Sequence, residues 1–238
     1  MKILKALFIL TCITLPLGQV ARLQLPGDVN FSLFDISVLL LSCVWLLRVI
    51  LGKSSYRSYT LSAPILLYFL TILISLLTNV FRYPMHELFV AALYAVRWLV
   101  FASVYFIIRG FEASFKEKLR VLLTISGTFV VIFGFIQYIF YANLRNLYYL
   151  GWDEHLVRMF STLLDPNFLG AFLVLFFLFL LGQIYEYFRH SGSAQNHFVL
   201  FRKTKLRDSG EVAASRNDGL KVLLLLILTV FTFFAIFL

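Results

Sequence analysis

The residues best suited to chemistry gather between Arg158 and Gly170, in a segment that reads RMFSTLLDPNFLG and lies between two strongly apolar stretches. Asp165 followed by Pro166 is typical of a helix start, because aspartate accepts from orphan backbone N–H groups and proline tolerates the first helical position. The positive end of that helix dipole, together with Arg158 and Arg145, would favour a phosphate or diphosphate group. A plain capped helix beside an interfacial arginine is the alternative interpretation.

Arg97 is a second candidate, because it lies about ten residues inside an apolar stretch, roughly 15 Å deep at the rise of a helix. A charge there costs at least ~2.5 kcal/mol on insertion scales, which makes the residue a candidate for a functional site. The alternative is a structural arginine that pairs with Asp35 or with helix carbonyls. Asp35 itself fits a capping box, Ser32-x-x-Asp35, at the start of a helix.

The loop before Arg158 is dense in titratable groups for a chain this apolar. His155 is a candidate general base, with Asp153 or Glu154 to orient it. A merely solvated histidine is the alternative. Cys12 and Cys43 lie in apolar stretches, and no Gly-rich phosphate loop, zinc-binding helix or nucleophile elbow occurs, so we expect no disulfide, no metal and no cofactor.

The composition indicates an integral membrane protein. Hydrophobic residues make up 61% and charged residues 14% of the 238 residues, against roughly 45–50% and about 25% in soluble domains. The net charge of +9 comes from basic residues in short loops between apolar stretches, a distribution that encodes orientation in a membrane and does not indicate a nucleic-acid partner.

The fold class predicted from these stretches is all-α, a polytopic bundle of about seven membrane helices, each close to the ~20 residues that cross a bilayer. The predicted spans are 3–20, 31–51, 61–80, 88–108, 121–142, 168–188 and 222–238. Residues 1–188 would form a six-helix region with an outer loop at 143–166, and the basic, polar stretch 189–221 a flexible cytoplasmic loop. The last span has no polar flank, so we expect a truncated chain, the N-terminal part of a larger bundle.

The basic residues also predict the orientation. Sixteen of the 21 lysines and arginines fall on the same side as the N-terminus, four fall on the other side, and Arg97 lies within a span. Because basic residues concentrate in cytoplasmic loops, the N-terminus is expected in the cytoplasm and Arg158 outside it.

The pattern R-x-x-S-T-x-x-D-P-N-x-L-G resembles the signature of the O-antigen ligase and O-antigen polymerase superfamily. The matching residues are Arg158, Ser161, Thr162, Pro166, Asn167 and Gly170. The commonest form of the motif has asparagine where this chain has Asp165, a change that keeps the cap but adds negative charge and would weaken an anion site. Tyr94, Arg97 and Trp98 also resemble the corresponding helix of that family.

The resemblance implies a glycosyltransferase-type enzyme of the cytoplasmic (inner) membrane, acting in lipopolysaccharide or other cell-surface polysaccharide assembly. Such an enzyme moves an oligosaccharide from a polyprenyl diphosphate carrier to an acceptor hydroxyl of a lipid or a glycan, at the outer face and without a metal. Arg158 is the expected diphosphate ligand, with Arg97 and Arg145 as further candidates.

Other interpretations stay open beside the resemblance. The family's base is a histidine in a large outer loop of the C-terminal half, and this chain ends before such a loop, so the resemblance covers about the first half of a member. A transporter or flippase for a lipid-linked or anionic substrate, and a non-catalytic membrane scaffold, are the alternatives.

Overall fold

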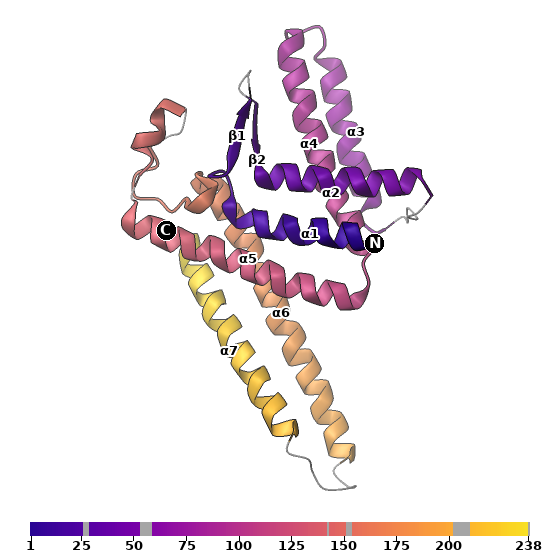
Figure 1. Cartoon of the computed structure of the whole chain (residues 1–238), viewed down its shortest axis with the longest axis vertical. Helices are drawn as coiled ribbons and strands as arrows, with labels where there is room; N and C mark the ends of the chain where they lie inside the picture. Colours follow the sequence, from indigo (N-terminus) through magenta and orange to yellow (C-terminus); the bar gives the residue numbers. More distant parts are fainter. Residues whose placement is uncertain (26–28, 53–58, 142, 151–153, 202–209, 238) are drawn as a thin grey trace. The chain divides into compact units, whose positions relative to one another are not determined.

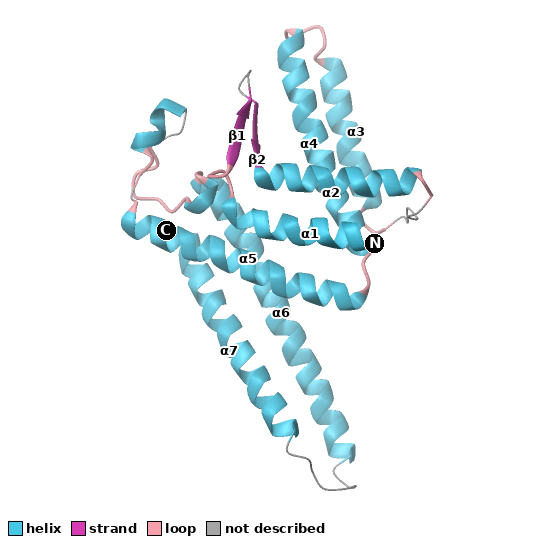
Figure 2. Cartoon of the chain, viewed as in Figure 1, coloured by secondary structure: helices cyan, strands magenta, loops and turns pink. Residues whose placement is uncertain are grey.

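The computed structural model describes residues 1–25, 29–52, 59–141, 143–150, 154–201 and 210–237. These residues form seven α-helices, three short 3₁₀ turns and one two-stranded hairpin (Figures 1 and 2). The helices are α1 (Lys2–Thr14), α2 (Leu33–Ile50), α3 (Ser62–Thr78), α4 (Met85–Arg109), α5 (Ala113–Phe140), α6 (Pro166–Phe201) and α7 (Gly210–Ile236). The chain divides into two compact units, Met1–Leu123 and Thr124–Leu238.

In the first unit, α2 packs against both α1 and α4, and α3 pairs with α4. Aromatic and aliphatic side chains from α1, α2, the end of α4 and the start of α5 form its core: Leu4, Phe8, Cys12, Leu41, Ile107, Phe111, Phe115 and Leu119. The start of α5 therefore belongs to this unit, and α5 begins eight residues before the predicted span at Val121.

The first helix ends earlier than the sequence predicts. A proline inside an α-helix removes a hydrogen bond and clashes with the preceding turn, and α1 stops at Thr14, just before Pro16. A 3₁₀ turn follows at Leu15–Leu17, and then strands β1 (Arg22–Leu25) and β2 (Val29–Ser32) pair antiparallel. The sequence patterns do not predict this hairpin. At 1.5 Å per residue α1 is about 20 Å long, short of the ~30 Å hydrocarbon layer.

In the second unit, α6 and α7 lie side by side (Figure 1), and the rings of Phe177 and Phe233 join them at a centroid distance of 5.8 Å. A glycine on α5 permits close approach to α6, because a Cβ built at Gly127 would lie 2.2 Å from the ring of Phe176. A small residue at this position lets the two helices pack closely.

The protein is a multi-pass membrane protein with four candidate spans: Leu33–Ile50, Met85–Arg109, Ala113–Phe140 and Pro166–Arg189. Two shorter apolar segments, helix α3 (Ser62–Thr78) and residues Leu220–Ile236 of α7, overlap two further predicted spans. The all-α class is confirmed, and four of the helices are long and apolar enough to cross a membrane.

Helices also extend into the stretch 189–221, for which the sequence predicts a flexible loop. The backbone is helical through Phe201 in α6 and again from Gly210 in α7. Residues 202–209 lie outside the described part of the chain, so the flexible connection stays a prediction.

Candidate functional site

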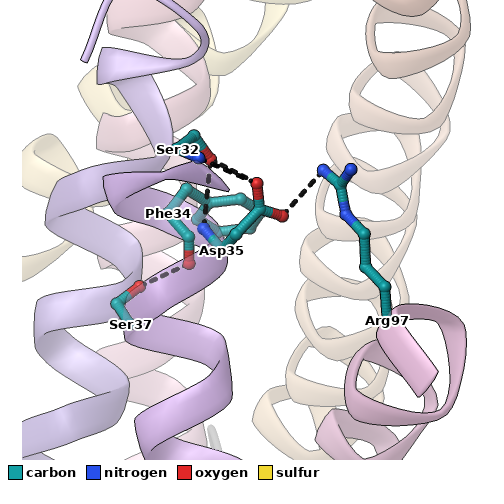
Figure 3. A network of polar contacts seen from close by, with 5 residues as sticks. All are labelled: Ser32, Phe34, Asp35, Ser37 and Arg97. Carbon is teal, nitrogen blue, oxygen red and sulfur yellow. Dashed lines mark hydrogen bonds and ion pairs between the residues drawn. The ribbon is translucent and has the colours of Figure 1, made fainter. Parts of the chain in front are cut away.

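The first constellation of polar groups lies at the start of α2 (Figure 3). Ser32 and Asp35 form the predicted capping box: the Ser32 hydroxyl accepts from the Asp35 backbone N–H at 3.1 Å, and Asp35 Oδ2 accepts from the Ser32 backbone N–H at 3.0 Å. The Ser32 hydroxyl also donates to Asp35 Oδ2 at 2.8 Å. The carboxylate is thus both a helix cap and a buried anion, with 4% of its side chain exposed.

Arg97 projects from the middle of α4 toward this carboxylate (Figure 3). Its Nη2 lies 2.8 Å from Asp35 Oδ1. Its guanidinium also faces the ring of Phe101, with 6.0 Å between Cζ and the ring centroid. This ion pair is the one expected if Arg97 is a structural arginine. Although it is paired with Asp35, 40% of the arginine side chain remains exposed.

The second constellation lies on the loop between α5 and α6, in the second unit. The non-glycine residues with positive φ in the described chain all lie here: His155 (44°), Val157 (53°), Ser161 (48°) and Leu164 (57°). Non-glycine residues avoid this region at a cost of about 1 kcal/mol or more each, and a β-branched valine there is a clear outlier. The loop is therefore held in a conformation that local preferences oppose.

Gln137, on the last turn of α5, binds this loop with both ends of its amide. Its Oε1 accepts from the backbone N–H groups of Phe160 at 2.8 Å and Ser161 at 3.1 Å. Its Nε2 donates to the backbone carbonyls of Tyr141 at 2.8 Å and Arg158 at 3.3 Å. Sequence motifs do not single out Gln137, and the one usable signal is an amide among apolar residues near the end of a predicted span.

Buried side chains anchor the same loop. Phe160 is 1% exposed and packs with Leu144 and Leu164. The Ser161 hydroxyl, also buried, donates to the backbone carbonyl of Val130 at 2.8 Å. Ser161 thus has a structural role in the predicted small polar pair. The hydroxyl oxygen of its neighbour Thr162 is buried with no hydrogen-bond partner among the described residues.

Arg158 stands at the exposed edge of this anchored loop, directly before the buried Met159. No carboxylate of the described residues pairs with its guanidinium. Arg145 differs, because its Nε lies 3.1 Å from Glu154 Oε2. Of the two loop arginines, Arg158 is thus the better placed to meet an anion from solution.

His155 gains no orienting carboxylate from the described residues. Its ring is tilted against that of Phe160 at a centroid distance of 6.5 Å. Glu154, one of the two predicted orienting groups, is engaged with Arg145 instead. Asp153, the other, lies outside the described residues. The catalytic role of His155 stays a prediction.

The predicted helix start after the loop is confirmed. α6 begins at Pro166, and Asp165 Oδ1 accepts from the backbone N–H groups of Asn167 at 2.7 Å and Phe168 at 3.1 Å. Asn167 is exposed. A Cβ added at Gly170 would meet nothing within 4 Å, so packing does not require a glycine there.

Arg97 belongs to the first unit and the arginines of the loop to the second, so a diphosphate site shared by Arg97, Arg145 and Arg158 stays a prediction. Within the described residues, no group of three His, Cys, Asp or Glu side chains gathers in the manner of a metal site.

Comparisons with protein-family models, with curated proteins and with solved structures find no match to this chain. The resemblance to the O-antigen ligase and polymerase superfamily therefore rests on the motif residues themselves. The loop that carries them, from Arg158 to the capped start of α6, is the candidate functional site.

Proposed function

We propose that this chain acts in glycan transfer at the outer face of the cytoplasmic membrane, as an O-antigen ligase-like or polymerase-like protein. The donor is an oligosaccharide on a polyprenyl diphosphate, and the acceptor is a hydroxyl group of a lipid or another glycan. The observation that carries the proposal is the exposed Arg158 beside buried anchors, on the loop that bears the motif and leads into the capped start of α6.

The chemistry assigns a role to the positive charge. The acceptor oxygen forms a bond to the anomeric carbon of the donor sugar, the bond from that carbon to the diphosphate oxygen breaks, and the polyprenyl diphosphate leaves with the electron pair. A guanidinium stabilises the negative charge that develops on the leaving group and binds two of its oxygens at once. The proton of the acceptor hydroxyl passes to a base, for which His155 is the candidate in this chain.

Asp165 weakens the binding of an anion at the start of α6. Its Oδ1 caps two backbone N–H groups at the start of α6, and these are donors that an anion would otherwise use. We therefore assign the diphosphate to Arg158 first, with the dipole of α6 as a weaker contribution.

The test uses the full chain in membrane vesicles that contain an oligosaccharide linked to undecaprenyl diphosphate. Arg158→Ala is expected to lower transfer and undecaprenyl diphosphate binding by about tenfold or more, because a charge-assisted contact worth ~1.5–3 kcal/mol is lost. Arg158→Lys is also expected to lose much of both, since an ammonium cannot form the bidentate contact.

Arg82→Ala is the matched control, because Arg82 is another exposed arginine on the predicted outer side, in the turn between α3 and α4. Wild-type transfer and binding in both Arg158 variants would remove Arg158 from the site. Loss in the alanine variant alone would reduce Arg158 to a point charge.

A second function, movement of an anionic or lipid-linked substrate across the membrane, draws support from Arg97. Its pairing with Asp35 leaves 40% of an arginine side chain exposed in the middle of a candidate span, and an ionisable residue at such a position is a candidate for a substrate pathway. Transbilayer movement of the lipid-linked oligosaccharide, without bond transfer and abolished by Arg97→Gln, would favour this function.

A further inference from the structure

We propose that Gln137 is a positioning residue that holds the 158–161 segment in the conformation that presents Arg158. This proposal rests on the proposed function for the role of Arg158 in diphosphate binding. The claim that Gln137 fixes the conformation of the 158–161 segment rests on the geometry of the loop alone.

The hydrogen bonds of Gln137 match the capacity of its amide. A carboxamide oxygen has two lone pairs and the NH₂ group has two hydrogens. The oxygen accepts from the N–H groups of Phe160 and Ser161, and the nitrogen donates to the carbonyls of Tyr141 and Arg158. Because Gln137 as a whole residue is only 9% exposed, water is a poor substitute partner, and each of these backbone groups would lose its bond if Gln137 were removed.

The backbone conformation of the loop is unfavourable and needs stabilising contacts such as these hydrogen bonds. Val157, Ser161 and Leu164 adopt positive φ, which the backbone of these residues resists. Contacts from outside the loop must therefore maintain that conformation. Gln137 bonds to both sides of Met159, at the Arg158 carbonyl and at the Phe160 N–H, so it sets the path of the chain on which Arg158 stands.

No close relative of glutamine reproduces the pattern. Asparagine is one methylene shorter on the same backbone. Glutamate keeps the acceptor oxygen, but when ionised it has no donor for the two carbonyls and repels them. A protonated glutamate regains one donor. Gln137→Glu is therefore expected to work better in acid than at neutral or alkaline pH, a dependence that a space-filling role would not produce.

The experiment compares the wild-type protein with Gln137→Leu and Gln137→Glu in lipid nanodiscs. Hydrogen exchange reports the backbone N–H groups of Phe160 and Ser161, and titration with undecaprenyl diphosphate reports the anion site. Gln183→Leu is the matched control, because Gln183 is a partly buried glutamine of the same unit that bonds to the Thr124 hydroxyl at 3.0 Å, away from the loop.

We expect Gln137→Leu to lose protection at both amides and to bind the diphosphate about tenfold more weakly, while Gln183→Leu stays near wild type in both measurements. Gln137→Glu should resemble Gln137→Leu at pH 8 and move toward wild type as the pH falls toward about 4.3, the ordinary pKa of a glutamate carboxyl, each compared with wild type at the same pH.

Unchanged protection of the Phe160 and Ser161 amides in Gln137→Leu would overturn the proposal. So would released amides combined with wild-type affinity for the diphosphate. If the wild type itself does not bind undecaprenyl diphosphate, the proposed function fails, and the exchange data with the pH response of Gln137→Glu decide the positioning role independently.

Discussion

The guanidinium of Arg97 lies 2.8 Å from the carboxylate of Asp35, and the two partners differ sharply in exposure: 40% of the arginine side chain is accessible, against 4% of the aspartate. The pair is therefore asymmetric. Removing Arg97 leaves a buried anion without its counter-ion, whereas removing Asp35 leaves a cation that still reaches water.

This asymmetry predicts the order of three variants. Arg97→Leu should lower the free energy of unfolding in detergent by on the order of 1–3 kcal/mol, because the buried carboxylate loses its partner while half-exposure of the arginine limits the effect. Asp35→Asn should cost less, since asparagine can still accept from Ser32. The double variant Asp35→Asn/Arg97→Leu should recover most of the loss. An additive double variant would show that the two side chains do not interact.

Gly127 should tolerate substitution poorly. A Cβ there would lie 2.2 Å from the Phe176 ring, and such overpacking typically costs about 1–3 kcal/mol, against a gain of up to ~1 kcal/mol in helix propensity. Gly127→Ala should lower the melting temperature in detergent, and Phe176→Leu should partly restore it. Gly134→Ala is the matched control, because its Cβ would meet the flexible side chain of Met159, with Sδ at 2.8 Å. Equal melting temperatures for the two alanine variants would argue against the packing seen at Gly127.

The orientation inferred from the basic residues can be tested by thiol labelling. Tyr148 is exposed in the loop before α6, and Ser114 is exposed at the start of α5. In a Cys43→Ser background, Tyr148→Cys should react with a membrane-impermeant maleimide on intact cells, and Ser114→Cys should react only after the cells are opened. Cys12 is buried, so it should contribute little signal. Reaction of Ser114→Cys on intact cells would contradict the predicted orientation.

An ion pair joins the start of the chain to the turn after α4. Lys5 Nζ lies 2.5 Å from Glu112 Oε1, and the hydrogen bond and charge of Lys5 lower the pKa of the Glu112 carboxyl below its ordinary value. A carboxyl with a lowered folded-state pKa stabilises the fold above its unfolded pKa, and that contribution disappears as the pH falls through the folded value.

Glu112→Gln should therefore lower the melting temperature slightly at neutral pH, and the difference from wild type should shrink as the pH falls below about 4.3, the ordinary pKa of a glutamate carboxyl. Thermal melts of both proteins from pH 7 down to pH 3.5 provide the measurement. Because the pair is exposed, the effect should also shrink in high salt. A difference that persists unchanged in acid would assign the effect to something other than the ion pair.

Features that depend on neighbouring residues were predictable from the sequence. The membrane class follows from composition and from the length of the apolar stretches, which need no knowledge of packing. The capping box of Ser32 and Asp35, and the start of α6 at Pro166 after Asp165, are bonds between residues a few positions apart. Such local features can be predicted from the sequence because the partners lie close together in the chain.

Only the tertiary structure chose between alternatives for Arg97 and revealed Gln137. Arg97 had several possible partners by sequence, and the packing of α2 against α4 selects Asp35. Gln137 forms hydrogen bonds with backbone groups 21 to 24 residues away. Because every residue has the same backbone groups, the residue types do not indicate which residues are the partners. The positive φ angles of Val157 and Leu164 oppose their own propensities. Long-range contacts override local preference there, which is why the loop that presents Arg158 could be located from the sequence but its shape could not be derived.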